Sequence, residues 1–214
     1  MSFLKELIMT KETSYGILAA IDWNSNEWQG PSTPEDLEKA NFTFVKENDI
    51  INASLNFGHT VFPADDNGYY RGFLPHLFAK TPDIEKSRTI KIVILKAKDW
   101  HDGNTYIVGF YAFPTFKKER IPSPIESITE DIETNIKSLV KHIHFLENRV
   151  NLSVPSDITK SLPKDKKPGK MGYNYLNQIS IERLLDVMTA LNPDDKKLSS
   201  IKLNIFKAMG YSMV

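Results

Sequence analysis

The chain has 214 residues, of which 41% are hydrophobic, so it is long enough to bury the core of one large or two small domains. Its 27 basic and 27 acidic residues balance, which excludes a strongly basic nucleic-acid-binding surface and limits any polyanion site to a local patch. The lack of cysteine excludes disulfides and Cys-ligated zinc, and without a leader or an apolar run of about 18 residues we expect a cytoplasmic, non-membrane protein.

The first part of the chain is dominated by β-prone segments. The apolar run over residues 14–21 is short and ends in a turn-prone sequence, which predicts a buried strand. Thr33 is followed by Pro34 and by acidic residues, the pattern of a capped helix start. Further short strands are expected over residues 42–45, 51–57 and 69–74, the last after an Asp-Asp-Asn-Gly turn.

The strongest β signal is a pair of segments over residues 89–97 and 105–113. Both are rich in Ile, Val, Tyr and Phe, and a polar stretch over residues 99–104 separates them. This pattern predicts a hairpin with a wide loop.

A change in composition after residue 114 predicts a boundary between a β-rich domain over residues 1–116 and a helical extension over residues 117–214. Formal charge divides similarly, at −4 for the first part and +4 for the second. One helix is expected where apolar residues recur at spacings of three and four, namely Ile132, Ile136, Leu139, Val140, Ile143 and Leu146. Two more are expected over residues 181–191 and 198–209, the last ended by Gly210, with a basic loop over about 153–172.

No enzyme motif is present. The sequence has no phosphate-binding glycine loop, no Gly-x-Ser-x-Gly turn and no His-Glu-x-x-His helix. Asp99, His101 and Asp102 resemble a catalytic cluster only in composition, because polar residues fill most hairpin loops. We therefore expect a protein that is not an enzyme, with no catalytic residue, metal site or cofactor.

The aromatic residues are more informative. Trp23 and Trp28 lie in a polar loop after the first predicted strand, where two large rings favour a planar or cationic guest. The alternative is that one or both fold back over the core. In the later segment a strand would place Tyr69 and Arg71 on one face and Tyr70 on the other, so at least one tyrosine is expected in the core.

Together these segments resemble the PUA-like superfamily, specifically its EVE and YTH branches, and the N-terminal recognition domains of McrB-type modification-dependent restriction systems. The resemblance covers roughly residues 14–115. It rests on a strand that enters a tryptophan-bearing loop, on the Gly-aromatic-aromatic-x-Gly-aromatic segment over residues 68–73, and on Ile-Val-Gly-Phe-Tyr at residues 107–111. The Gln29-Gly30 pair after Trp28 departs from the YTH pattern, which has a Ser/Thr-type residue there.

The resemblance implies a small twisted β-barrel with flanking helices, hence an α+β fold, that holds one methylated base in an aromatic pocket, flipped from a duplex or taken from a single strand. The base-binding residues that it implies, with amides for the base edge, are Trp23, Asn24, Trp28, Asn56, Phe57, Tyr69 and Tyr70. Phosphate contacts would come from Lys39, Lys46, Arg71, Lys80, Arg88, Lys164, Lys166, Lys167 and Lys170. The expected partner is DNA with a modified base, with an NTPase or nuclease of a restriction system on another chain or region.

Two other interpretations stay open. The same aromatic surface could bind a peptide in a protein-interaction or adaptor domain, which suits the neutral charge. A weaker interpretation is an enzyme that acts on a nucleotide or nucleic acid through Asp99, His101 and Asp102.

Overall fold

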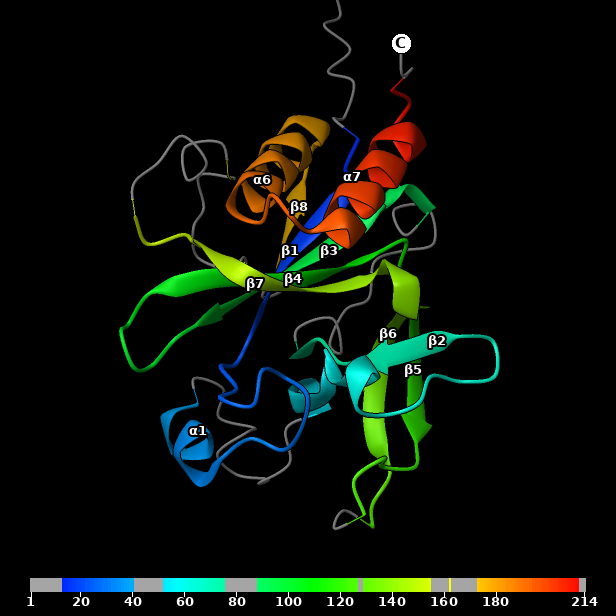
Figure 1. Ribbon diagram of the computed structural model, residues 1–214. Helices are drawn as coiled ribbons and strands as arrows, with labels where there is room; N and C mark the ends of the chain where they lie inside the picture. Colours follow the sequence, from blue (N-terminus) through cyan, green and yellow to red (C-terminus); the bar gives the residue numbers. More distant parts are fainter. Residues whose placement is uncertain are drawn as a thin grey trace, which may run out of the picture.

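The computed structural model describes residues 13–40, 52–75, 88–126, 129–154, 162 and 173–211. These residues form an α+β fold with eight strands in two sheets and three α-helices. Helices α6 (Gln178–Leu191) and α7 (Lys196–Ala208) cover one face of a five-stranded sheet, while α1 (Pro34–Lys39) and a three-stranded sheet lie on the other side (Figure 1).

The five-stranded sheet has the order β7-β4-β3-β1-β8. Its strands are β1 (Gly16–Ile21), β3 (Ile92–Lys98), β4 (Thr105–Ala112), β7 (Ile143–Asn151) and β8 (Tyr173–Leu176). β1 is parallel to β3, and the other pairs are antiparallel. The predicted first strand and the predicted hairpin are both confirmed, since β3 pairs with β4 across the loop at residues 99–104.

The three-stranded sheet has the order β2-β6-β5 and is antiparallel. It consists of β2 (Tyr69–Gly72), β5 (Thr115–Ile121) and β6 (Ile132–Leu139). β2 reaches only as far as Ile136 on β6, opposite Gly72. Among the described residues, the strand pairings form two open sheets and close no barrel.

The five-stranded sheet separates two hydrophobic cores. Along β1, Leu18 faces the helices and packs with residues such as Leu184 and Ile201, whereas Ile17 and Ile21 face the opposite way and pack with Trp28. This alternation is what a strand buried on both faces requires. The second core therefore lies between the large sheet, the loops that follow β1, and the small sheet.

All three helices are predicted by the sequence, although α6 and α7 begin three and two residues before the expected positions. Thr33 caps α1 by a reciprocal pair of hydrogen bonds with Asp36, with Pro34 at the first helical position. Asn177 and Asp195 cap α6 and α7 through their side chains. Gly210, with a positive φ of 96°, follows the end of α7 as expected.

Two predicted elements are wrong. The helix expected over residues 132–146 is instead β6, a short 3-10 turn at Val140–His142, and the start of β7. Ile132 and Ile136 are four residues apart, a spacing that also fits the two-residue period of a strand, and the β-branched residues here favour the strand. The strand expected over residues 51–57 is instead a 3-10 turn, Asn52–Leu55. Two residues later, Phe57 donates its N–H to the carbonyl of Trp28.

The residues beyond 116 are not a separate helical layer. β7 pairs with β4 and β8 pairs with β1, so strands from the predicted extension complete the large sheet, and β5 and β6 pair with each other in the small one. In this part of the described chain, α-helices occur only from Gln178 onward. The strand expected over residues 42–45 and most of the predicted basic loop lie outside the described residues.

Candidate ligand-binding pocket

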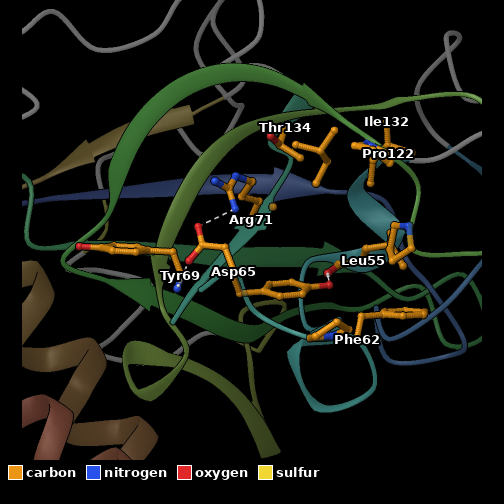
Figure 2. A pocket seen from close by; sticks show the side chains of 13 residues that line it. Leu55, Phe62, Asp65, Tyr69, Arg71, Pro122, Ile132 and Thr134 are labelled. Carbon is orange, nitrogen blue, oxygen red and sulfur yellow. Dashed lines mark hydrogen bonds and ion pairs between the residues drawn. The ribbon is translucent and has the colours of Figure 1, made fainter. Parts of the chain in front are cut away.

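A pocket of about 160 Å³ opens beside the small sheet, at the point where β2 ends. Most of its wall is apolar, from Leu55, Phe62, Pro63, Tyr70, Ile121, Pro122, Pro124 and Ile132. Figure 2 shows Arg71 and Asp65 at one side, with Pro122 and Ile132 along one wall and Leu55 and Phe62 opposite. The pocket thus joins the turns at residues 52–63 to the β5–β6 connection.

The turn before β2 positions the polar side of the pocket. Gly68 adopts a positive φ of 76°, and Asp65 Oδ1 accepts the N–H groups of Asn67 and Tyr69 at 3.1 and 2.9 Å. Asp65 Oδ2 accepts from Arg71 Nη1 at 2.8 Å, and Arg71 Nε donates to Glu119 Oε2 at 3.0 Å. Two carboxylates from different elements therefore hold one guanidinium.

This ion-pair network keeps its members charged. Burial acts to raise the pKa of Asp65, but the N–H of Tyr69 and the Arg71 guanidinium lower it below its usual value. The Lys117 ammonium, 2.6 Å from Glu119 Oε1, and the Arg71 guanidinium likewise lower the pKa of Glu119. Neither carboxyl is therefore suited to take up a proton as a general base near neutral pH.

The opposite side of the pocket is built on Tyr70. Its ring is buried between β2 and the 3-10 turns, and its hydroxyl donates to the Leu55 carbonyl at 2.9 Å. Burial raises the pKa of Tyr70, so the phenol stays neutral. At the end of β2, position 72 requires glycine, because a Cβ there would clash with the Tyr111 hydroxyl at 2.5 Å.

The size and the lining of the pocket suit a small flat group. Sites for drug-sized ligands measure roughly 300–1,000 Å³, so a pocket of about 160 Å³ suits a single ring system. The two ion pairs of Arg71 use two of the five N–H groups of a guanidinium. Arg71 and Asp65 place a hydrogen-bond donor beside an acceptor at this side of the pocket.

Trp23 and Trp28 do not line this pocket. Trp28 is 1% exposed and Trp23 is 8% exposed, and their rings meet edge to face at 5.5 Å. Trp28 Nε1 donates to the Asp22 carbonyl at 2.9 Å, and the guanidinium of Arg149 covers Trp23 at 5.0 Å. Both tryptophans fold back over the core, which was the alternative to an open aromatic cage.

The amides expected to read a base edge are engaged inside the protein. Asn24 Oδ1 accepts the N–H groups of Asn26 and Trp28 at 2.8 and 3.0 Å, and its amide donates to Ser32. Asn56 bonds to both backbone groups of Phe73, at 2.7 and 3.0 Å. Phe57 is fully buried beside Trp28. These three residues hold loops against the core.

Tyr69, Tyr70 and Arg71 are the predicted site residues that the structure brings to the pocket. Tyr69 takes part mainly through its backbone, because its ring points away from the other labelled side chains (Figure 2) and lies under the ammonium of Lys137 at 5.3 Å. Sequence reasoning missed Asp65, Phe62, Glu119 and the proline-rich wall. The turn motif at residues 65–68 was visible in the sequence. No local pattern predicts the contact between Arg71 and Glu119, which are 48 residues apart.

The hairpin loop at residues 99–104 lies elsewhere. His101 Nδ1 is 2.8 Å from Asp99 Oδ1, and Asp102 accepts from the Tyr106 hydroxyl at 2.6 Å. Hydrogen bonds from Tyr106 and Asn104 lower the pKa of Asp102. Asp99 and Asp102 are each bound within their own loop, and none of the three residues lines the pocket.

Of the predicted phosphate-binding residues, Arg71 is held in the pocket, Lys39 lies on α1 beside Glu38, and Arg88 is exposed before β3. The others, Lys46, Lys80, Lys164, Lys166, Lys167 and Lys170, lie outside the described residues.

Comparison of the chain with protein-family models, curated proteins and solved structures found no significant match. Within the described ranges, no group of three or more His, Cys, Asp or Glu side chains is arranged to hold a metal ion. No helix in that part of the chain is long and apolar enough to cross a membrane.

Proposed function

We propose that this protein is an EVE/YTH-like, PUA-like nucleic-acid-binding domain that receives one modified base in the pocket beside β2. The observation that carries the proposal is the combination in one pocket of an apolar wall over Tyr70 with a donor–acceptor pair from Arg71 and Asp65. A methylated base needs both features, because its ring and methyl group favour apolar contact and its edge requires hydrogen-bond partners.

Of the aromatic partners that the resemblance implied, the proposal keeps Tyr70 and replaces the two tryptophans by Phe62. With Trp23 and Trp28 in the core, we assign contact with the base to Phe62 and Tyr70 and the reading of its edge to Arg71 and Asp65. Ile132 and Leu55 then surround the methyl group. The pocket acts by binding alone, and any nuclease or NTPase of the same system lies on another chain or region.

The test is a titration of labelled DNA oligonucleotides that carry one adenine, N6-methyladenine, cytosine or 5-methylcytosine, each single-stranded and double-stranded, followed by anisotropy at fixed salt. One methyl group in an apolar pocket contributes about 1–3 kcal/mol, so we expect one modified oligonucleotide to bind roughly 10-fold to 200-fold tighter than its unmodified form. Equal affinity for all forms would refute the proposal.

Two substitutions connect that preference with this pocket. Phe62→Ala and Arg71→Gln should remove the preference for the modified base, since they delete an apolar wall and the hydrogen-bonding side of the pocket. The matched controls are Phe206→Ala and Lys202→Gln on α7, a partly buried phenylalanine and a basic residue paired with Asp186. The controls should keep the preference.

A further inference from the structure

Strand β5 concentrates positive charge next to the pocket. Within its seven residues lie Lys117, Lys118 and Arg120 against one acid, Glu119. The Lys117 and Arg120 side chains are 65% and 71% exposed, whereas that of Glu119 is 19% exposed and turned towards Arg71. The basic side chains therefore expose most of their surface to solvent, although Lys117 pairs with Glu119 and Arg120 pairs with Glu133 on β6 at 3.2 Å.

The whole small sheet shares this bias. Its three strands carry the five basic residues Arg71, Lys117, Lys118, Arg120 and Lys137 and the two acids Glu119 and Glu133, a formal charge of +3. With Asp65, which pairs with Arg71 just before β2, the sum is +2. The complete chain is formally neutral. A local positive patch is what a polyanion needs on a protein with no net charge.

The position of β5 at the edge of the small sheet makes its basic side chains accessible. β5 is an edge strand, with β6 as its neighbour in the sheet order. The β5–β6 pairing is irregular between Phe116 and Glu119. Lys118 and Arg120 are nevertheless both exposed on either side of the less exposed Glu119, at a separation of roughly 7 Å along the strand. That separation is comparable to the distance between neighbouring phosphates of an extended nucleic-acid strand.

β5 also leads straight into the pocket. Its last residue, Ile121, and the following Pro122 line the pocket wall. A chain of ion pairs connects the two sites, from Lys117 through Glu119 to Arg71 and then to Asp65, at 2.6, 3.0 and 2.8 Å. A backbone that lies along β5 would thus bring one of its bases to the mouth of the pocket.

From these observations we infer that Lys117, Lys118 and Arg120 of β5 bind the sugar–phosphate backbone of the nucleic acid whose base enters the pocket, an inference that rests on the proposed function. Charged residues on an edge strand also prevent strand pairing between protein molecules. That role alone predicts aggregation, without a change in nucleic-acid affinity, when the charges are removed.

The experiment compares the triple variant Lys117→Gln/Lys118→Gln/Arg120→Gln with the triple variant Arg183→Gln/Lys196→Gln/Lys207→Gln. The second set changes the net charge equally but lies on exposed positions of α6 and α7. Affinity for methylated and unmethylated DNA, and for the corresponding RNA, is measured between about 50 and 200 mM salt. Light scattering of each variant alone reports aggregation.

We expect the β5 variant to lose affinity for both methylated and unmethylated forms and to reduce the slope of log affinity against log salt by about 2, from roughly 0.7 per single-strand phosphate contact. Its preference for the methylated form should persist. The control variant should keep the slope of the wild-type protein. The better-bound of the DNA and RNA series identifies the backbone.

Failure of the two ideas can be told apart. If methyl preference is present but the two triple variants have equal slopes, the role of β5 is overturned and the pocket stands. If the β5 variant loses its salt slope but no modified oligonucleotide is preferred, the base pocket is overturned and the backbone contact stands.

Discussion

Two aromatic regions lie on the same side of the large sheet but differ in whether their rings fill the core or line a pocket. In the loop after β1, Trp23 and Trp28 pack against the core and are almost completely buried. Beside β2, Tyr70 is also buried but forms one side of a pocket that Phe62 and Pro122 also line. The first region holds the fold together, and the second leaves space for a ligand.

The difference comes from what the neighbouring polar groups bind. In the tryptophan loop, Asn24 bonds within the loop, and Glu27 and Trp28 adopt positive φ angles of 58° and 57° that turn the Trp28 ring inward. Beside β2, the ion pairs of Arg71 hold side chains around the pocket. The polar composition of a loop therefore does not predict whether its aromatic side chains point into the core or towards solvent.

The largest expected effect is the loss of stability when an aromatic residue of each region is replaced by alanine. Trp28→Ala should lower the free energy of unfolding by about 3–5 kcal/mol, because it removes a fully buried ring. Phe62→Ala, at a half-buried position, should cost only about 1 kcal/mol. Urea denaturation followed by circular dichroism measures both. Similar losses for the two variants would remove the distinction between core and pocket.

Next in size is the amide that orders the tryptophan loop. Asn24→Ala should cost about 3 kcal/mol, because the buried N–H of Trp28 loses its partner along with the other bonds of that amide. Asn104→Ala in the exposed hairpin loop is the control and should cost under about 1 kcal/mol. Thermal unfolding of both variants checks the prediction, and an unaffected Asn24→Ala protein contradicts it.

A third prediction concerns pH. Burial, together with Lys197 and His144, lowers the pKa of His59, whose ring packs against Tyr70, to about 4. An unfolded histidine titrates near 6.5, so the unfolded state binds the proton first and stability falls as the pH drops from about 6.5 to about 4. The shift corresponds to at most about 3 kcal/mol, reduced to about 2 by partial exposure.

The measurement is the free energy of unfolding against pH for the wild-type protein, His59→Gln and His101→Gln. His59→Gln should make the decline between about pH 6.5 and 4 smaller without abolishing it, because burial also lowers the pKa of His142 and His144. His101→Gln, in the exposed loop, should follow the wild type. A wild-type curve without a decline in that interval would contradict the burial of His59.

The smallest expected effect on stability belongs to Arg71. Asp65 keeps the N–H of Tyr69 and Glu119 keeps Lys117 as partners, and glutamine retains a hydrogen-bond donor. Arg71→Gln should therefore change the free energy of unfolding by only about 1.5 kcal/mol while it removes the base preference. A loss of several kcal/mol would place Arg71 among the structural residues instead.

Much of the fold could be predicted from local signals. The apolar run of β1, the β3–β4 hairpin, the capped start of α1 and the apolar spacing of α6 each depend on neighbouring residues. Over residues 132–146 the local signal was ambiguous, because apolar residues four apart satisfy both a helix and a strand. The pairing of β7 with β4 decided between them, and that contact is not local.

The site was less predictable. Tyr70 and Arg71 were identified, but the pocket depends on contacts such as Arg71 with Glu119, which join elements far apart in the chain. The direction of Trp23 and Trp28 depended on the hydrogen bonds of Asn24 and on backbone angles that no spacing of residues reveals.

The most direct test of the central claim locates the methyl group of the bound base. Protein with labelled Leu and Ile methyl groups is mixed with an oligonucleotide that carries one 13C-methylated base, and intermolecular nuclear Overhauser effects are recorded. The account predicts contacts from the base methyl to Leu55, Ile121 and Ile132 of the pocket. Contacts to Ile17 or Ile21 beside the tryptophans, or none under conditions that saturate binding, would contradict it.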